Sequence, residues 1–146
     1  MKKVIVVVIC MFLFLLGCDN NVSNEPIKAE TKVYDFILSI ETNKRVYEEE
    51  DPINVFSYFE YVGEGIQLNT EPLITIVVQN RQNGNIIKQM DYHDIQKSMK
   101  KGEKFSQSIE GFNLKKGKYA IYGSANFSIG ASYFLANTEP IFINVK

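Results

Sequence analysis

Asp91, His93 and Asp94 place the only histidine of the chain beside two carboxylates. A histidine that acts as a general base needs an orienting partner and a nucleophile within hydrogen-bond reach. Three serines follow in the sequence: Ser98, Ser106 and Ser108. No nucleophile-elbow sequence frames any of them. We therefore expect no catalytic residues and no enzyme activity, and one histidine without cysteine partners does not promise a zinc site.

An acidic run covers residues 48–51, which read Glu-Glu-Glu-Asp. Calcium needs roughly six to eight oxygen ligands that converge on one point. Successive side chains in a turn mostly point apart, so we expect a solvated turn and neither a metal ion nor a cofactor. In a sandwich, this turn lies at the same end as Lys115, Lys116 and Lys118, which would attract it weakly.

Cys18 follows a charged start and an unbroken apolar stretch. Lys2 and Lys3 precede residues 4–16, all of which are apolar. This pattern is typical of a secretory signal peptide, and the stretch is too short to span a bilayer comfortably. Cys10 is removed with the signal, so the mature chain is left with one cysteine and its core has no disulfide.

The ending Leu15-Leu16-Gly17-Cys18 resembles the lipobox of bacterial lipoproteins. In those proteins the cysteine sulfur receives a diacylglyceryl group, and signal peptidase cuts just before the cysteine. The resemblance implies a signal peptide over residues 1–17 and a lipidated Cys18 at the mature N-terminus. Acyl chains such as palmitate would hold the protein at the outer face of the cytoplasmic membrane, because two chains are needed for lasting attachment.

The rest of the chain divides into a tether and one domain. The formal net charge is -1, and it becomes -3 once Lys2 and Lys3 are removed. Nucleic-acid binding needs a concentrated basic face, which this composition excludes. After Cys18, the polar, Asn-rich sequence up to residue 32 predicts a flexible tether over residues 18–32, with a reach of roughly 20 Å. Residues 33–146 are enough for one folded domain.

Apolar residues recur with period two along this domain, as in half-buried strands. Asn83-Gly84 predicts a hairpin with a type I′ turn, since that dipeptide accepts positive φ angles. Residues 91–101 are the one stretch with a helical pattern. Seven short strands predict an all-β sandwich, and they are expected over residues 36–41, 53–61, 73–79, 85–90, 105–109, 118–127 and 140–145.

Leu114, Gly117 and Tyr119 have the spacing of a tyrosine corner at the start of a strand. In immunoglobulin-like sandwiches, the hydroxyl of this tyrosine bonds to the backbone a few residues upstream. The position two residues further on, a cysteine in antibody domains, is Ile121 here. The sequence therefore predicts an immunoglobulin-like antiparallel β-sandwich, with a plain hairpin and a core tyrosine as the alternative.

The turn residues also resemble those of the bacterial intracellular proteinase inhibitor family, of BsuPI type. The resemblance rests on Tyr47, Pro52, the run Lys101-Gly102-Glu103 and the motif at residues 114–119. It implies the immunoglobulin-like fold, and it implies protease inhibition as one activity. The chain departs from that family in its export signal and in having no Trp, and fold does not imply function.

Large apolar residues crowd a turn that should be polar, around Gly130 and Ala131. They are Phe127, Ile129, Tyr133, Phe134 and Leu135. Tyr133, Phe134 and Leu135 either form a contact surface for a partner or membrane, or extend the last strand into the core. In the expected topology, the tether arrives at this same end of the sandwich.

Phe56 and Tyr58 are a second candidate surface. They alternate with the inward residues of their strand and should therefore face outward. Together these features favour a lipid-anchored, exported module that binds another envelope or extracellular protein. The alternative is an inhibitor of an extracellular peptidase, which needs a rigid, extended loop.

The lipobox leads to a direct test. Replacing Cys18→Ala should stop diacylglyceryl transfer and lipoprotein-specific cleavage, because the acceptor sulfur is gone. Labelling with a palmitate analogue and detergent-phase partitioning measure both effects. A processed variant that still partitions into the detergent phase contradicts lipidation at Cys18.

Overall fold

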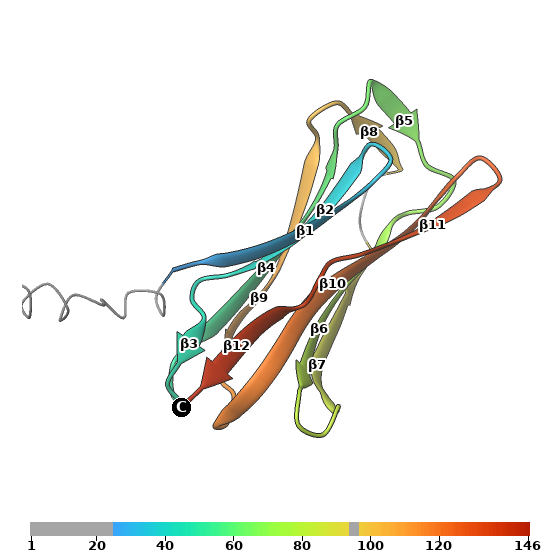
Figure 1. The fold of residues 1–146 in the computed structure, drawn as a ribbon. Helices are drawn as coiled ribbons and strands as arrows, with labels where there is room; N and C mark the ends of the chain where they lie inside the picture. The colour runs from blue at the N-terminus through green and yellow to red at the C-terminus, as the bar shows by residue number, and fades with distance from the viewer. Residues whose placement is uncertain (1–24, 94–96) are drawn as a thin grey trace, which may run out of the picture.

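The domain is a sandwich of two β-sheets (Figure 1). A computed structural model describes residues 25–93 and 97–146. Twelve strands cover most of this part, and the described residues contain no helix. An antiparallel four-stranded sheet has the order β1-β2-β4-β9, with bounds Ile27–Val33, Phe36–Thr42, Ile53–Tyr61 and Lys104–Phe112.

The second sheet has the order β3-β12-β10-β6-β7. In addition, β11 pairs with β10. Its strands are β3 Val46–Tyr47, β6 Leu73–Asn80, β7 Ile86–Tyr92, β10 Gly117–Ile129, β11 Ser132–Asn137 and β12 Ile141–Val145. The short strands β5 Gly65–Gln67 and β8 Ser98–Lys100 pair separately at one end. β3 pairs with β12 in parallel, and the other pairs are antiparallel.

Alternating burial in β4 and β10 builds the interior. Every second residue of β4, from Ile53 to Tyr61, is buried, and so is every second residue of β10 from Tyr119 to Phe127. Gly123 lies at the centre of β10, where a Cβ would meet Leu38, Ile40 and Ser57 at 3.8–3.9 Å. Because each face of a strand repeats every two residues, the two inner faces pack as one core.

The tyrosine corner is confirmed. The Tyr119 hydroxyl donates a 2.7 Å hydrogen bond to the backbone carbonyl of Lys115. Leu114 is buried beside it, and Ile121 fills the position that holds a cysteine in antibody domains. The corner, the two-sheet strand order and the parallel β3–β12 pair define an immunoglobulin-like β-sandwich.

The tether prediction was wrong over residues 27–32. These residues lie in β1, which pairs along its whole length with β2. Ile27, Ala29, Thr31 and Val33 alternate with exposed charged residues and half-bury one face of an edge strand. The remaining tether residues before 25, and the expected signal peptide, lie outside the described residues.

β1 also overturns the expected position of the tether. It begins at Ile27, opposite Thr42, and runs to the turn at Tyr34 and Asp35. Seven residues of strand cover roughly 20 Å. The chain therefore enters the sandwich away from the β10–β11 turn and not beside it, as Figure 1 shows.

The predicted β6–β7 hairpin is confirmed, but its type I′ turn and the helix expected over residues 91–101 were wrong. Gly84 has a positive φ of 73°, but Asn83 does not, so the β6–β7 connection is a longer loop closed by a bond from Gly84 N to Asn80 O (2.9 Å). Residues 91–101, where the sequence has a helical pattern, instead include the end of β7 and the strand β8. Residues 94–96 lie outside the described residues. Buried Met99 holds β8 against the core, so tertiary packing overrides local propensity.

No helix of the described chain is both long and apolar enough to cross a bilayer.

Replacing Tyr119→Phe should lower the free energy of unfolding by about 0.5–1.5 kcal/mol, the net contribution of one intramolecular hydrogen bond. Chemical denaturation of the purified protein measures the change. Tyr122→Phe, on the outer face of the same strand, is the matched control. Equal effects of the two substitutions would show that the corner bond adds nothing to stability.

Candidate functional site

The β10–β11 hairpin carries two large, exposed apolar residues of the second sheet. Tyr133 is 68% exposed and Leu135 is 52% exposed. Both lie on one face of β11, opposite Ser128 and Asn126 of β10. The Tyr133 hydroxyl donates a 2.7 Å hydrogen bond to Asn126 Oδ1, which fixes the ring on this face. These two residues, with Asn126 and Ser128, are called the hairpin face below.

Phe134 lies on the other face of β11 and is partly buried against the core. Its ring stacks on Phe127 with centroids 5.4 Å apart, and Phe127 contacts Phe36 at 4.5 Å. On the outer side, Tyr34 meets Phe134 edge-on at 5.0 Å. Aromatic pairs at these separations add about 0.5–1.5 kcal/mol each beyond burial. The sequence left open whether residues 133–135 face the core or solvent, and the structure divides them.

Tyr34 is held in an unusual backbone conformation. It sits in the two-residue turn between β1 and β2 with φ of 54°, and it is the one non-glycine residue with positive φ in the described chain. Such a conformation costs an L-residue roughly 1–2 kcal/mol. The residue is nevertheless 73% exposed. Bulky residues in strained, exposed positions point to functional sites.

An open hollow of about 370 Å³ lies between this turn and the residues next to the hairpin turn. Its walls come from the β1–β2 turn with the start of β2, and from β4, β5, β10 and β11. The lining residues are Tyr34, Asp35, Phe36, Tyr61, Ile66, Ile129, Ser132 and Phe134. We call this feature the aromatic hollow. Sequence reasoning found Phe134 and missed Tyr34, because Tyr34 belongs to a turn that was not expected.

Phe56 and Tyr58 face outward on β4, as expected, but they are half-buried. In the register, Phe56 lies between Glu41 and Ser108, and Tyr58 between Ser39 and Ser106. The Lys104 ammonium lies 4.1 Å from the Tyr58 ring centroid and covers it. These two residues therefore lie on the outer face of the first sheet, separate from the hairpin face.

Asp91 of the histidine cluster lies apart from Ser106 and Ser108. Asp91 lies on the outer face of the second sheet, where it accepts a 2.7 Å hydrogen bond from Thr75 Oγ1. Ser106 and Ser108 lie beside Tyr58 and Phe56, on the outer face of the first sheet. Since the sandwich core separates these two faces, Asp91 and these serines cannot share one site. His93 is exposed, and Asp94 lies outside the described residues.

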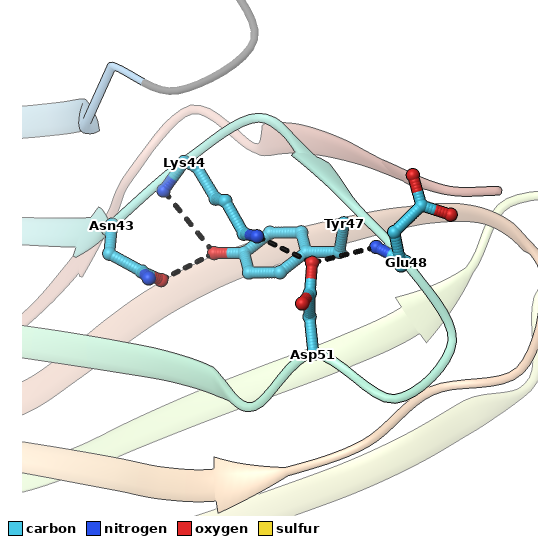
Figure 2. Close-up of polar contacts among 5 residues, drawn as sticks. All are labelled: Asn43, Lys44, Tyr47, Glu48 and Asp51. Atoms are coloured by element: carbon cyan, nitrogen blue, oxygen red, sulfur yellow. Dashed lines mark hydrogen bonds and ion pairs between the residues drawn. The ribbon is translucent and has the colours of Figure 1, made fainter.

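The acidic run forms a bonded turn (Figure 2). Asp51 Oδ2 accepts hydrogen bonds from Lys44 Nζ (2.5 Å) and from Glu48 N (2.8 Å). Both bonds lower the pKa of Asp51, and the bond from Lys44 has the larger effect. Beside them, the Tyr47 hydroxyl donates to Asn43 Oδ1 at 2.6 Å, and burial raises the pKa of Tyr47.

Glu49 joins this turn to the tyrosine corner. Its Oε1 accepts a 2.7 Å hydrogen bond from the backbone N–H of Lys116. The predicted proximity of the acidic turn and residues 115–118 is therefore confirmed, although a backbone group makes the bond. Across the described residues, no three His, Cys, Asp or Glu side chains gather as a metal site requires.

No family model matches the chain, and no curated protein matches it. Among solved structures, the chain is similar to the crystal structure of the C-terminal domain of wzt. The two share 9% sequence identity with a TM-score of 0.49, over 84% of this chain and 78% of the other. These comparisons assign no activity to the chain.

The backbone at Tyr34 leads to a prediction about stability. Tyr34→Gly should be more stable than Tyr34→Ala by about 1 kcal/mol, because both lose the ring but only glycine relieves the positive φ. Thermal and chemical unfolding measure the difference. At Asp35, which has no positive φ, the alanine variant should be more stable than the glycine variant. Alanine equal to glycine at position 34 would contradict the left-handed conformation.

Proposed function

We propose that this protein is a lipid-anchored module on the outer face of the cytoplasmic membrane, and that it binds another envelope protein through the hairpin face. The observation that carries the proposal is the exposure of Tyr133 and Leu135, side by side on a hairpin that extends beyond β6. Exposed apolar side chains gathered on one face mark interaction sites.

The surroundings of these two residues support a protein partner. Ser124, Asn126, Ser128 and Asn137 alternate around the apolar pair in the β10–β11 ladder. An apolar centre with a polar rim is the usual anatomy of a protein interface. A tyrosine whose hydroxyl is already bonded loses little freedom on binding, which suits it to the centre of such a contact.

The direction of β1 indicates that the hairpin face contacts a protein and not the bilayer to which the chain would be tethered. Ile27 pairs with Thr42, whereas the β1–β2 turn at the other end of the strand contacts the hairpin through Tyr34 and Phe134. The tether from Cys18 would thus join the domain on the side away from the hairpin. A hairpin that points away from the anchor is available to a second protein.

Inhibition of an extracellular peptidase is the second candidate. It requires a segment rigid enough to enter a protease cleft. Asn69 braces the hairpin turn, because its backbone N–H bonds to Ser128 O (2.9 Å) and its Nδ2 bonds to Gly130 O (2.8 Å). A panel of secreted serine, cysteine and metallopeptidases tests this activity directly.

A photo-crosslinking residue at Leu135 should form one discrete protein adduct in intact cells that make the protein. The same residue at Glu110, which is exposed on the first sheet, is the control and should not form it. Tyr133→Ser should abolish the Leu135 adduct and leave the thermal midpoint nearly unchanged, since the ring is mostly exposed. Equal adducts at both positions, or an adduct that survives Tyr133→Ser, would contradict the proposal.

A further inference from the structure

In the described part of the chain, the lining of the aromatic hollow contains a negative charge and no positive charge. Among the described residues that line it, Asp35 carries the one ionisable carboxylate, and none is Lys, Arg or His. The ammonium of Lys101, in the adjacent β8–β9 turn, is paired with Glu64 at 2.9 Å. The electrostatic potential inside the hollow is therefore suited to a cation and unsuited to an anion.

Aromatic residues form much of its wall: Tyr34 is exposed, Phe134 is partly buried, and Phe36 and Tyr61 are buried beneath them. The electron-rich face of an aromatic ring attracts a cation most strongly where water is partly excluded. Several rings around one volume, together with a carboxylate, are the usual recognition chemistry for an alkylated ammonium group.

The rings are fixed before any ligand arrives. Phe36 packs on Tyr61 at 4.8 Å and on Phe127 at 4.5 Å, and Phe134 is stacked on Phe127. Residues so tightly packed lose little freedom when a ligand binds, which favours affinity.

Gly63 shapes the polar corner of the hollow. A Cβ at this position would lie 2.3 Å from the Tyr61 hydroxyl oxygen and 2.8 Å from Asp35 Oδ2. The absence of a side chain at Gly63 therefore allows the hydroxyl and the carboxylate to occupy the same small region. Both are acceptor-capable oxygens near the aromatic walls.

We propose that the aromatic hollow binds a small, soluble molecule that carries an alkylated ammonium group. A primary ammonium is strongly hydrated and needs several hydrogen-bond acceptors, whereas most of this lining is aromatic or aliphatic. A quaternary ammonium brings an apolar methyl shell to the rings and its charge to Asp35. The volume of about 370 Å³ is within the usual range for small-molecule sites.

This site is distinct from the hairpin face. Phe134 faces the hollow, and Tyr133 and Leu135 point to the opposite side of β11. The inference therefore does not depend on the proposed protein partner, and each can fail alone.

The test is a titration of the purified full chain, in a maltoside detergent, with choline. Isothermal calorimetry measures affinity, and ring-proton shifts of Tyr and Phe residues locate the ligand. Choline should bind at least about 10-fold more tightly than 3,3-dimethylbutan-1-ol, its neutral isostere, and more tightly than methylammonium. The first comparison isolates the charge, and the second isolates the methyl shell.

Substitutions in the lining test whether choline binds in the aromatic hollow. Tyr34→Leu should weaken choline binding by about 3- to 30-fold, the range expected for a partly desolvated cation–aromatic contact. Asp35→Asn should weaken it by up to about 5-fold, the range expected for an exposed charge pair. Both residues are exposed, so folding should persist, and a thermal unfolding curve checks this. Tyr133→Leu, on the opposite face of β11, is the matched control and should leave choline affinity unchanged.

Three results would overturn the proposal. They are equal affinity for choline and its neutral isostere, choline affinity unchanged in both Asp35→Asn and Tyr34→Leu, and no choline binding in the millimolar range. Binding to phosphatidylcholine vesicles without binding of free choline would also overturn it, because the ligand would then be a lipid headgroup and not a soluble molecule.

Discussion

The domain depends on the pairing of β10 along both of its edges. One edge pairs with β6 from Tyr119 to Asn126, and the other pairs first with β12 and then with β11. The change of partner falls at Gly123, whose N–H bonds to Thr138 Oγ1 (3.0 Å) and whose carbonyl accepts from Thr138 N (2.9 Å). Buried backbone groups must be paired. Thr138 therefore supplies the hydrogen bonds at Gly123, where neither β11 nor β12 pairs with β10. β11 can therefore leave the sandwich as part of a projecting hairpin.

The sandwich itself could be predicted because its signals are local. Alternation in residues 53–61 reflects one buried and one outer face, and the spacing of Leu114, Gly117 and Tyr119 encodes a single hydrogen bond. β1 could not be predicted in the same way. Its inward residues include Ala29 and Thr31, which bury little apolar area, so an edge strand has nearly the composition of a tether.

The site was only partly predictable, for a related reason. Crowded apolar residues around Gly130 identify the hairpin as unusual, but alternation along β11 decides which of them are exposed. Tyr34 gives no signal in the sequence, because its importance arises from a turn between two strands, one of which was not recognised. A hollow built by five separate segments is a property of topology, and topology is set by long-range packing.

The two faces of β11 explain how one short strand can contribute to two surfaces. Phe134 supports the aromatic hollow from the inside, where its ring is stacked on Phe127 and held by Tyr34. Tyr133 and Leu135 lie on the other side and contribute little to the core. Substitutions on the outer side can therefore alter contacts without disturbing the hollow, whereas loss of the Phe134 ring would remove a wall of the hollow and the support of Tyr34 together. The strained turn at Tyr34 is maintained because packing on Phe134 compensates for part of its backbone cost.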